Sequence, residues 1–270
     1  MFMGKFKDLL LSIVALAVSY TVYKSSALLF SSISNGFLAE FLQHGIFAVA
    51  VFLSVLVLRK TSIYRSDLRK LKAGWPSALI ILLLISVPAI QAFTMISDIS
   101  VTGFEFILFL AKMLLIGYCE EVLFRGLIQN AFHKIFGENN TLRVFLGVIC
   151  GAFCFGAIHL GNILNPEVSL SAAALQAIYS FFSGILLGTV YFRTGKNLWV
   201  VILLHAINDF FAFIVTGRLS GSDVGQAISS ASSSLAANSG PLRLLVTFCI
   251  YAAVSLFLLR PKKIKQLQEL

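Results

Sequence analysis

The stretch Glu120-Glu121-Val122-Leu123-Phe124-Arg125-Gly126 places two adjacent carboxylates and a guanidinium within a strongly apolar part of the chain. The surrounding residues, 104–132, are dominated by Phe, Leu, Ile and Val, and they are numerous enough to cross a lipid bilayer. Each charge in the hydrocarbon core costs roughly a few kcal/mol or more. We therefore interpret these charged residues as part of a reaction site that is buried among membrane helices.

The composition of the whole chain is that of a polytopic membrane protein. Of its 270 residues, 58% are hydrophobic and 12% are charged, and the mean hydropathy is +0.91. Soluble domains carry about 25% charged residues. The net charge of +9 does not indicate a nucleic-acid partner, because the basic residues fall in short connections between apolar runs, where they report membrane orientation. We expect the lipid bilayer as the surroundings and no nucleic acid.

Apolar segments long enough to span a membrane recur along the chain and predict an all-α fold, a single helical bundle over residues 1–270 with about eight transmembrane helices. Most basic residues fall in connections on one side of these segments, so the positive-inside rule predicts that both termini are cytoplasmic. Residues 217–240, rich in Ser, Ala and Gly, are predicted to form a long polar outer loop. The predicted spans are Leu9–Phe30, Phe37–Leu58, Ser77–Ile96, Phe104–Phe132, Val144–Leu160, Leu170–Phe192, Leu198–Thr216 and Leu244–Leu259.

The spacing of Glu120, Glu121 and Arg125 divides the charges of the fourth span into two roles. Residues four apart lie on one face of a helix, so Glu121 and Arg125 are predicted to form a neutralising ion pair. Glu120 lies about 100° round the helix from Glu121 and is left free for chemistry.

Two other predicted spans carry polar residues that could meet these carboxylates. The fifth ends with His159, and Phe155, one turn earlier, is expected to wall or orient it. In the seventh, His205 and Asp209 share a face, whereas the adjacent Asn208 points elsewhere and is given a secondary role.

A carboxylate and two histidines among apolar walls suit hydrolysis. The carboxylate can act as general base, and a histidine can share the activated water or protonate the leaving amine. A second histidine with a hydrogen-bonding Asp or Asn can stabilise an oxyanion. The alternative is that Glu120, His159 and His205 bind a divalent metal such as zinc, which would lower the pKa of a bound water. The ligand types do not separate these two mechanisms.

The motifs of three other classes of intramembrane protease do not fit. No His is followed by Glu, as a site-2-type metalloprotease requires, and Ser183-Gly184 lacks the earlier glycine of a rhomboid-type serine protease. Asp209 is the only aspartate within a predicted span, whereas a presenilin-type enzyme needs two.

The three polar sets, Glu120-Glu121-x-x-x-Arg125, Phe155-x-x-x-His159 and His205-x-x-x-Asp209, resemble the motifs of the CAAX prenyl protease and bacteriocin-processing family, also called the Abi family. They occur in the family's order within a motif-bearing core at residues 103–216. The resemblance implies an intramembrane endopeptidase in which Glu120 activates water and His159 assists it. It implies His205 and Asp209 as partners that stabilise the oxyanion or bind metal; the last position is Asn or Asp in the family.

We therefore expect a hydrolase that cleaves a peptide bond of a membrane-associated peptide or protein, without a required metal. The short loops and compact length favour a bacterial plasma membrane and a peptide, bacteriocin precursor or membrane-protein substrate. The alternative is a non-catalytic scaffold or bacteriocin-immunity-type protein that acts through a partner membrane protein. A transporter is disfavoured because no internal repeat is found.

Overall fold

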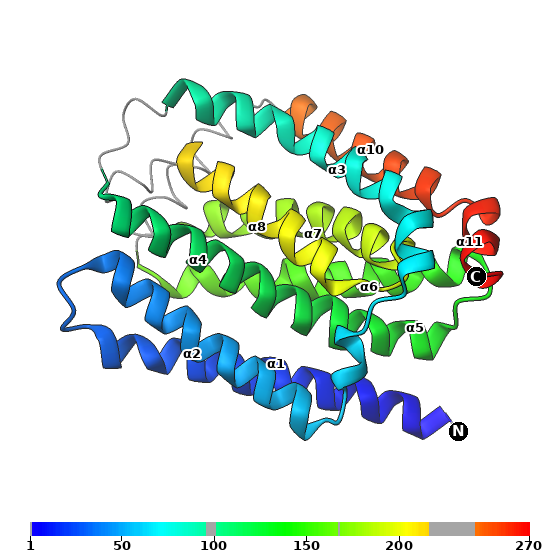
Figure 1. Ribbon diagram of the computed structural model, residues 1–270, viewed down its shortest axis with the longest axis horizontal. Helices are drawn as coiled ribbons and strands as arrows, with labels where there is room; N and C mark the ends of the chain where they lie inside the picture. The colour runs from blue at the N-terminus through cyan, green and yellow to red at the C-terminus, as the bar shows by residue number, and fades with distance from the viewer. Residues whose placement is uncertain (1, 96–100, 167, 216–240) are drawn as a thin grey trace.

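The computed structural model describes residues 2–95, 101–166, 168–215 and 241–270, and these ranges contain helices and no strand. Most of the helices run along the length of one bundle (Figure 1). In chain order the elements are α1 (Phe2–Phe30), α2 (Gly36–Val57), η1 (Thr61–Tyr64), α3 (Leu68–Met95), α4 (Gly103–Glu121), η3 (Val122–Gln129), α5 (Asn130–Phe136), α6 (Thr141–His159), η4 (Leu160–Leu164), α7 (Leu170–Arg193), α8 (Leu198–Val215), α10 (Pro241–Leu258) and α11 (Pro261–Gln268).

The all-α prediction is confirmed, and the described part of each of the eight predicted spans lies largely within helices. Five helices are long and apolar enough to cross a membrane, which makes the chain an integral membrane protein; eight spans remain a prediction. The outer loop predicted over 217–240 lies outside the described residues. The five helices are Phe6–Phe30, Gly36–Val57, Thr141–Leu164, Leu170–Arg193 and Leu198–Val215.

The fourth predicted span is one continuous helical path that changes type in the middle. It begins at a capping box in which Thr102 and Glu105 exchange hydrogen bonds, and it ends at Gly137, whose positive φ of 86° is a conformation that suits glycine. Between α4 and α5 the residues form a π-helix, η3, in which every side chain is buried. Because η3 starts directly after Glu121, the two adjacent carboxylates lie at the junction where the helix widens, and π-helical turns are frequent at functional sites.

Helix α4 lies between the α1–α2 pair and α8 (Figure 1), and it contacts both α2 and α8. On the α2 side, buried Lys112 forms an ion pair with Glu40, which explains a lysine inside a predicted span. On the α8 side, Gly117 lets the two backbones approach closely: a Cβ atom built there would lie 2.8 Å from the carbonyl oxygen of Ile202. Small residues at such crossings are typical of packed membrane helices.

Both termini lie at the same end of the bundle (Figure 1). Side-chain contacts join the segments gathered there. The Asp8 carboxylate contacts Lys60 and Lys134, and Arg193 donates to the backbone carbonyl of Lys263 at 2.7 Å. This arrangement agrees with termini on one side of the membrane, and their cytoplasmic placement stays a prediction.

Candidate active site

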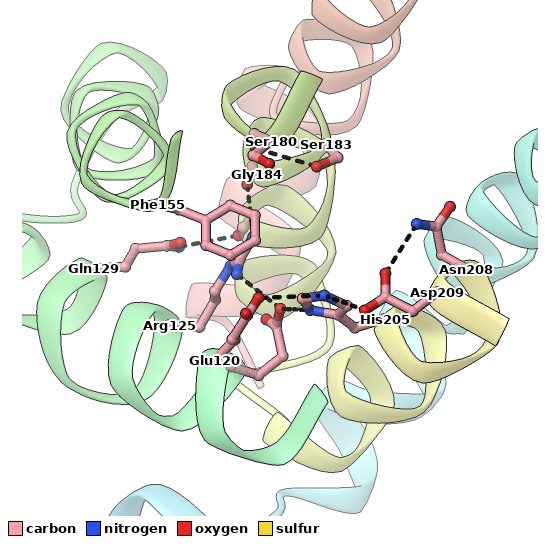
Figure 2. A network of polar contacts seen from close by, with 12 residues as sticks. Glu120, Arg125, Gln129, Phe155, Ser180, Ser183, Gly184, His205, Asn208 and Asp209 are labelled. Carbon is pink, nitrogen blue, oxygen red and sulfur yellow. Dashed lines mark hydrogen bonds and ion pairs between the residues drawn. The ribbon is translucent and has the colours of Figure 1, made fainter. Parts of the chain in front are cut away.

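The predicted ion pair between Glu121 and Arg125 is confirmed, and it has a third member. Arg125 Nη1 donates to Glu121 Oε1 at 2.7 Å, and His205 Nδ1 donates to the same oxygen at 2.6 Å. All three side chains are buried, with Glu121 fully inaccessible. Figure 2 shows Arg125 and His205 converging from different helices on the carboxylates at the end of α4. Glu121 therefore joins α4 to α8, besides neutralising the guanidinium.

The other ring nitrogen of His205 faces two carboxylates. His205 Nε2 lies 3.5 Å from Glu120 Oε2 and 3.4 Å from Asp209 Oδ2. These contacts are long for hydrogen bonds, as is common in active sites without substrate. Because Nδ1 already donates to Glu121, an imidazole that carries both protons presents Nε2–H to Glu120 and Asp209. Glu120 thus faces His205 of another helix, while Glu121 neutralises Arg125, as the spacing predicts.

Phe155 and His159 are arranged as their spacing predicts. His159 Nδ1 donates to the backbone carbonyl of Phe155 at 2.7 Å, so its Nε2 remains for other partners. The Phe155 ring meets the rings of His159 and His205 edge-to-face, with centroids 5.0 Å and 5.9 Å apart. Phe155 thus separates and orients the two histidines. His159 lies close enough to Glu120 for an electrostatic interaction between them.

Arg125 is held on three sides. Beyond its bond to Glu121, it approaches the carbonyl of Gly184 on α7 at 3.5 Å and lies 4.4 Å from the centre of the Phe155 ring. A guanidinium over an aromatic face gains a cation–π interaction, which is stronger where water is excluded. These contacts hold Arg125 firmly next to Glu121.

Asn208 has only a long contact with the site. Its Nδ2 lies 3.5 Å from Asp209 Oδ1, and Figure 2 shows it beyond Asp209, away from Glu120. This position agrees with the secondary role that we expected for it.

Glu120 lines a cavity of about 70 Å³, which has room for a few water molecules. The opposite wall comes from α1 and α2, two helices for which the sequence predicted no site residue. His44 Nδ1 donates to the Glu40 carbonyl at 2.7 Å, and its Nε2 lies 3.3 Å from the Tyr23 hydroxyl. Sequence reasoning missed this wall, although a histidine within the second span was a signal. The lining includes Leu16, Tyr20, Tyr23, His44, Phe47, Ile116, Glu120, Leu123, Phe124 and Ile158.

The metal site considered above stays a prediction. Among the described residues, no three or more His, Cys, Asp or Glu side chains are grouped so that they could hold a metal ion. Zinc binds imidazole nitrogen at about 2.0–2.1 Å and most often takes four ligands. His205 donates Nδ1–H to Glu121, as zinc-bound histidines also donate to a carboxylate, and its Nε2 faces Glu120 and Asp209. The mechanism below is derived from the residues alone.

A family model described as "Type II CAAX prenyl endopeptidase Rce1-like" matches residues 102–211, which include all three motifs. No curated protein matches the chain significantly, and neither does any solved structure. The match confirms the resemblance seen in the motifs and agrees with a bundle of apolar helices. Over this motif-bearing segment the chain is similar to the CAAX prenyl endopeptidase family.

Proposed function

We propose that this protein is an intramembrane endopeptidase that hydrolyses a peptide bond with water activated by Glu120. The observation that carries the proposal is the approach of Glu120 Oε2 to His205 Nε2, at 3.5 Å, beside a cavity of water size. Peptide hydrolysis needs a base and a proton donor close to one water; Glu120 lines the cavity, and His205 reaches Glu120 from outside its lining. The family match supports a protease of this class.

In the proposed reaction, Glu120 takes a proton from a water molecule. The oxygen of that water attacks the scissile carbonyl carbon at the same time. The carbonyl oxygen becomes an oxyanion and accepts a hydrogen bond from His205 Nε2–H. Glu120 then passes its proton to the leaving nitrogen, the C–N bond breaks, and an acid and an amine are released. His159 assists Glu120 in holding the water, Asp209 orients His205, and Glu121 fixes the imidazole through Nδ1.

The substrate that we propose is a membrane-associated peptide or protein, because Glu120 lies among helices that cross the bilayer. Within that class, a prenylated C-terminal peptide follows from the family description, and an unmodified bacterial peptide follows from the compact chain. We propose a bacterial plasma membrane with cytoplasmic termini as the location. A scaffold that acts through a partner membrane protein would have no need of the contact between Glu120 and His205.

The decisive experiment compares two Glu→Gln variants of the same helix. Glu120→Gln keeps the side-chain shape but removes the base, and it should lower peptide cleavage by at least about 10²-fold. Glu105→Gln is the matched control, because a Gln at the third position preserves the capping box with Thr102. Cleavage is followed with purified protein and quenched fluorescent peptides, one ending in a prenylated CAAX sequence and one unmodified.

Both variants should be produced and should unfold at the same temperature as the parent. Equal cleavage by Glu120→Gln and the parent would refute Glu120 as the base. Absence of cleavage by the parent, combined with an unaltered cellular phenotype in Glu120→Gln, would favour the scaffold.

A further inference from the structure

A second, larger cavity lies at the end of the bundle where both termini are found. Its volume is about 340 Å³, within the range of small-molecule sites, and its lining residues come from α1, η1, η3, α5, α7 and the connections beside η1 and after α7. None of the residues assigned to catalysis lines it. Its charged lining residues are Asp8, Lys60, Arg65, Lys134 and Lys196.

The lining carries more positive than negative charge. Lys60 and Lys134 donate to the same oxygen of Asp8, at 2.9 Å and 2.6 Å, so two ammonium groups share a single carboxylate. Lys196 is paired separately with Glu138, at 2.5 Å. The shared Asp8 leaves one positive charge uncompensated, and Arg65 adds a second. A phosphate could accept from both lysines, which bind phosphate as point charges.

Asn130, one of the lining residues, has a buried acceptor to which no described residue donates. Asn130 Nδ2 donates to the Gly126 carbonyl at 2.9 Å and to the Tyr191 hydroxyl at 2.7 Å, which fixes the orientation of its amide. Its Oδ1 is buried, and no described residue donates to it. A buried acceptor without a partner is costly, so a ligand hydroxyl that reached Oδ1 from the cavity would be favoured.

The surroundings place the cavity at the depth of lipid headgroups. Trp199 is half-exposed, and its indole N–H donates to the carbonyl of Tyr64, next to the lining residue Arg65. Tryptophans of this kind gather at the membrane–water interface. On α1, the residues that follow Asp8 present an apolar exposed face on which acyl chains can lie; these are Leu10, Ile13 and Val14.

We propose that this cavity binds the headgroup of an anionic phospholipid, with the phosphate between Lys60 and Lys134 and a headgroup hydroxyl on Asn130 Oδ1. A lipid is favoured over free phosphate because the basic cavity opens beside an apolar helix face at the interface. Basic pockets between helices on the loop side of membrane proteins suit such headgroups. The proposal does not depend on the protease activity.

The test counts bound lipids on the full-length, detergent-purified protein by native mass spectrometry, with phosphatidylglycerol against phosphatidylcholine. Phosphatidylglycerol should bind preferentially. Lys60→Gln and Lys134→Gln should each weaken its affinity about fivefold. Asp8→Asn removes the competing carboxylate and should strengthen the affinity for phosphatidylglycerol. A gain in affinity cannot result from poor folding, so this variant supports the proposal even if the lysine variants fold poorly. Lys262→Gln, an exposed lysine at the same end of the bundle, is the matched control and should change nothing.

Inorganic phosphate and a short peptide with a free C-terminal carboxylate serve as competitors. Neither should displace phosphatidylglycerol at equal concentration. Displacement by inorganic phosphate would assign the site to a free anion, and displacement by the peptide but not by its amide would assign it to a substrate carboxylate; either result overturns the lipid proposal. Equal binding of both lipids, or weakening by Lys262→Gln as large as by Lys60→Gln, would also overturn it.

Discussion

His205 Nδ1 lies 2.6 Å from Glu121 Oε1, across 84 residues of sequence. The same oxygen accepts from Arg125 at 2.7 Å. The ion pair that makes charge tolerable in the fourth span therefore also sets the position of an imidazole from another helix. This contact fixes which nitrogen of His205 faces Glu120 and Asp209. Glu121 is thus a positioning residue for the proposed reaction, although it does not line the Glu120 cavity.

Glu121→Gln should destabilise the protein strongly. The substitution leaves Arg125 buried without an opposite charge, and breaking a buried pair in this way costs about 3–5 kcal/mol. Thermal unfolding in detergent measures the loss. Glu138→Gln is the control, because Glu138 and Lys196 are both about one third exposed and such pairs contribute about 0–1 kcal/mol.

Removal of both charges should restore part of that stability. In Glu121→Gln/Arg125→Met no buried charge is left alone, so the double variant should unfold at a higher temperature than Glu121→Gln. Its cleavage should stay low because His205 has lost its charged acceptor. If the loss of stability in the double variant equalled the sum of the losses in the two single variants, pairing with Glu121 would not be the main role of Arg125.

Asp209→Asn should retain cleavage within about tenfold, whereas Asp209→Leu should lose about 10²–10³-fold. An amide can still orient His205 across the 3.4 Å contact with Nε2, and it adds an N–H donor for the oxyanion. Kinetic measurements should show that the loss lies in kcat and not in KM. Asn208→Leu serves as the control, since Asn208 has only the 3.5 Å contact with Asp209. If Asp209→Asn were as inactive as Asp209→Leu, the negative charge itself would be required.

Much of the fold could be predicted, because apolar runs of bilayer length are the strongest signal that a sequence carries. The predicted span Phe104–Phe132 corresponds to α4, η3 and the start of α5. The π-helix η3 could not be predicted, because its residues have the same apolar pattern as an α-helix. It depends on tertiary packing, such as Gln129 donating to the Gly188 carbonyl of α7 at 3.0 Å.

The members of the candidate site could be named from spacing, but their partners could not. Helical periodicity correctly pairs Glu121 with Arg125 and His205 with Asp209, since these contacts are local. Periodicity along one helix has no information about which face of α8 meets α4, so the bond between Glu121 and His205 was missed. For the same reason the α1–α2 wall of the Glu120 cavity was missed.

Chelators should leave cleavage unchanged, because the described residues offer no group suited to hold a metal ion. Purified protein treated with 1,10-phenanthroline or EDTA should cleave the quenched peptide at the rate of the untreated sample, and metal analysis should find less than one zinc per chain. Loss of cleavage that added Zn²⁺ restores would show that the residues rearrange around a metal during the reaction.

Gly117→Ala should lower both stability and cleavage, because α4 and α8 must separate to admit the methyl group. The new Cβ would lie 2.8 Å from the Ile202 carbonyl oxygen, a backbone atom that cannot turn aside. Overpacking of this kind costs about 1–3 kcal/mol. Separation of the helices would also lengthen the bond between Glu121 and His205 and reduce kcat.

Gly45→Ala in α2 is the matched control, since no atom lies within 4 Å of its Cβ position, and it should be neutral or slightly stabilising. Equal effects of the two substitutions on unfolding temperature and kcat would show that the close approach at Gly117 does not hold the site together.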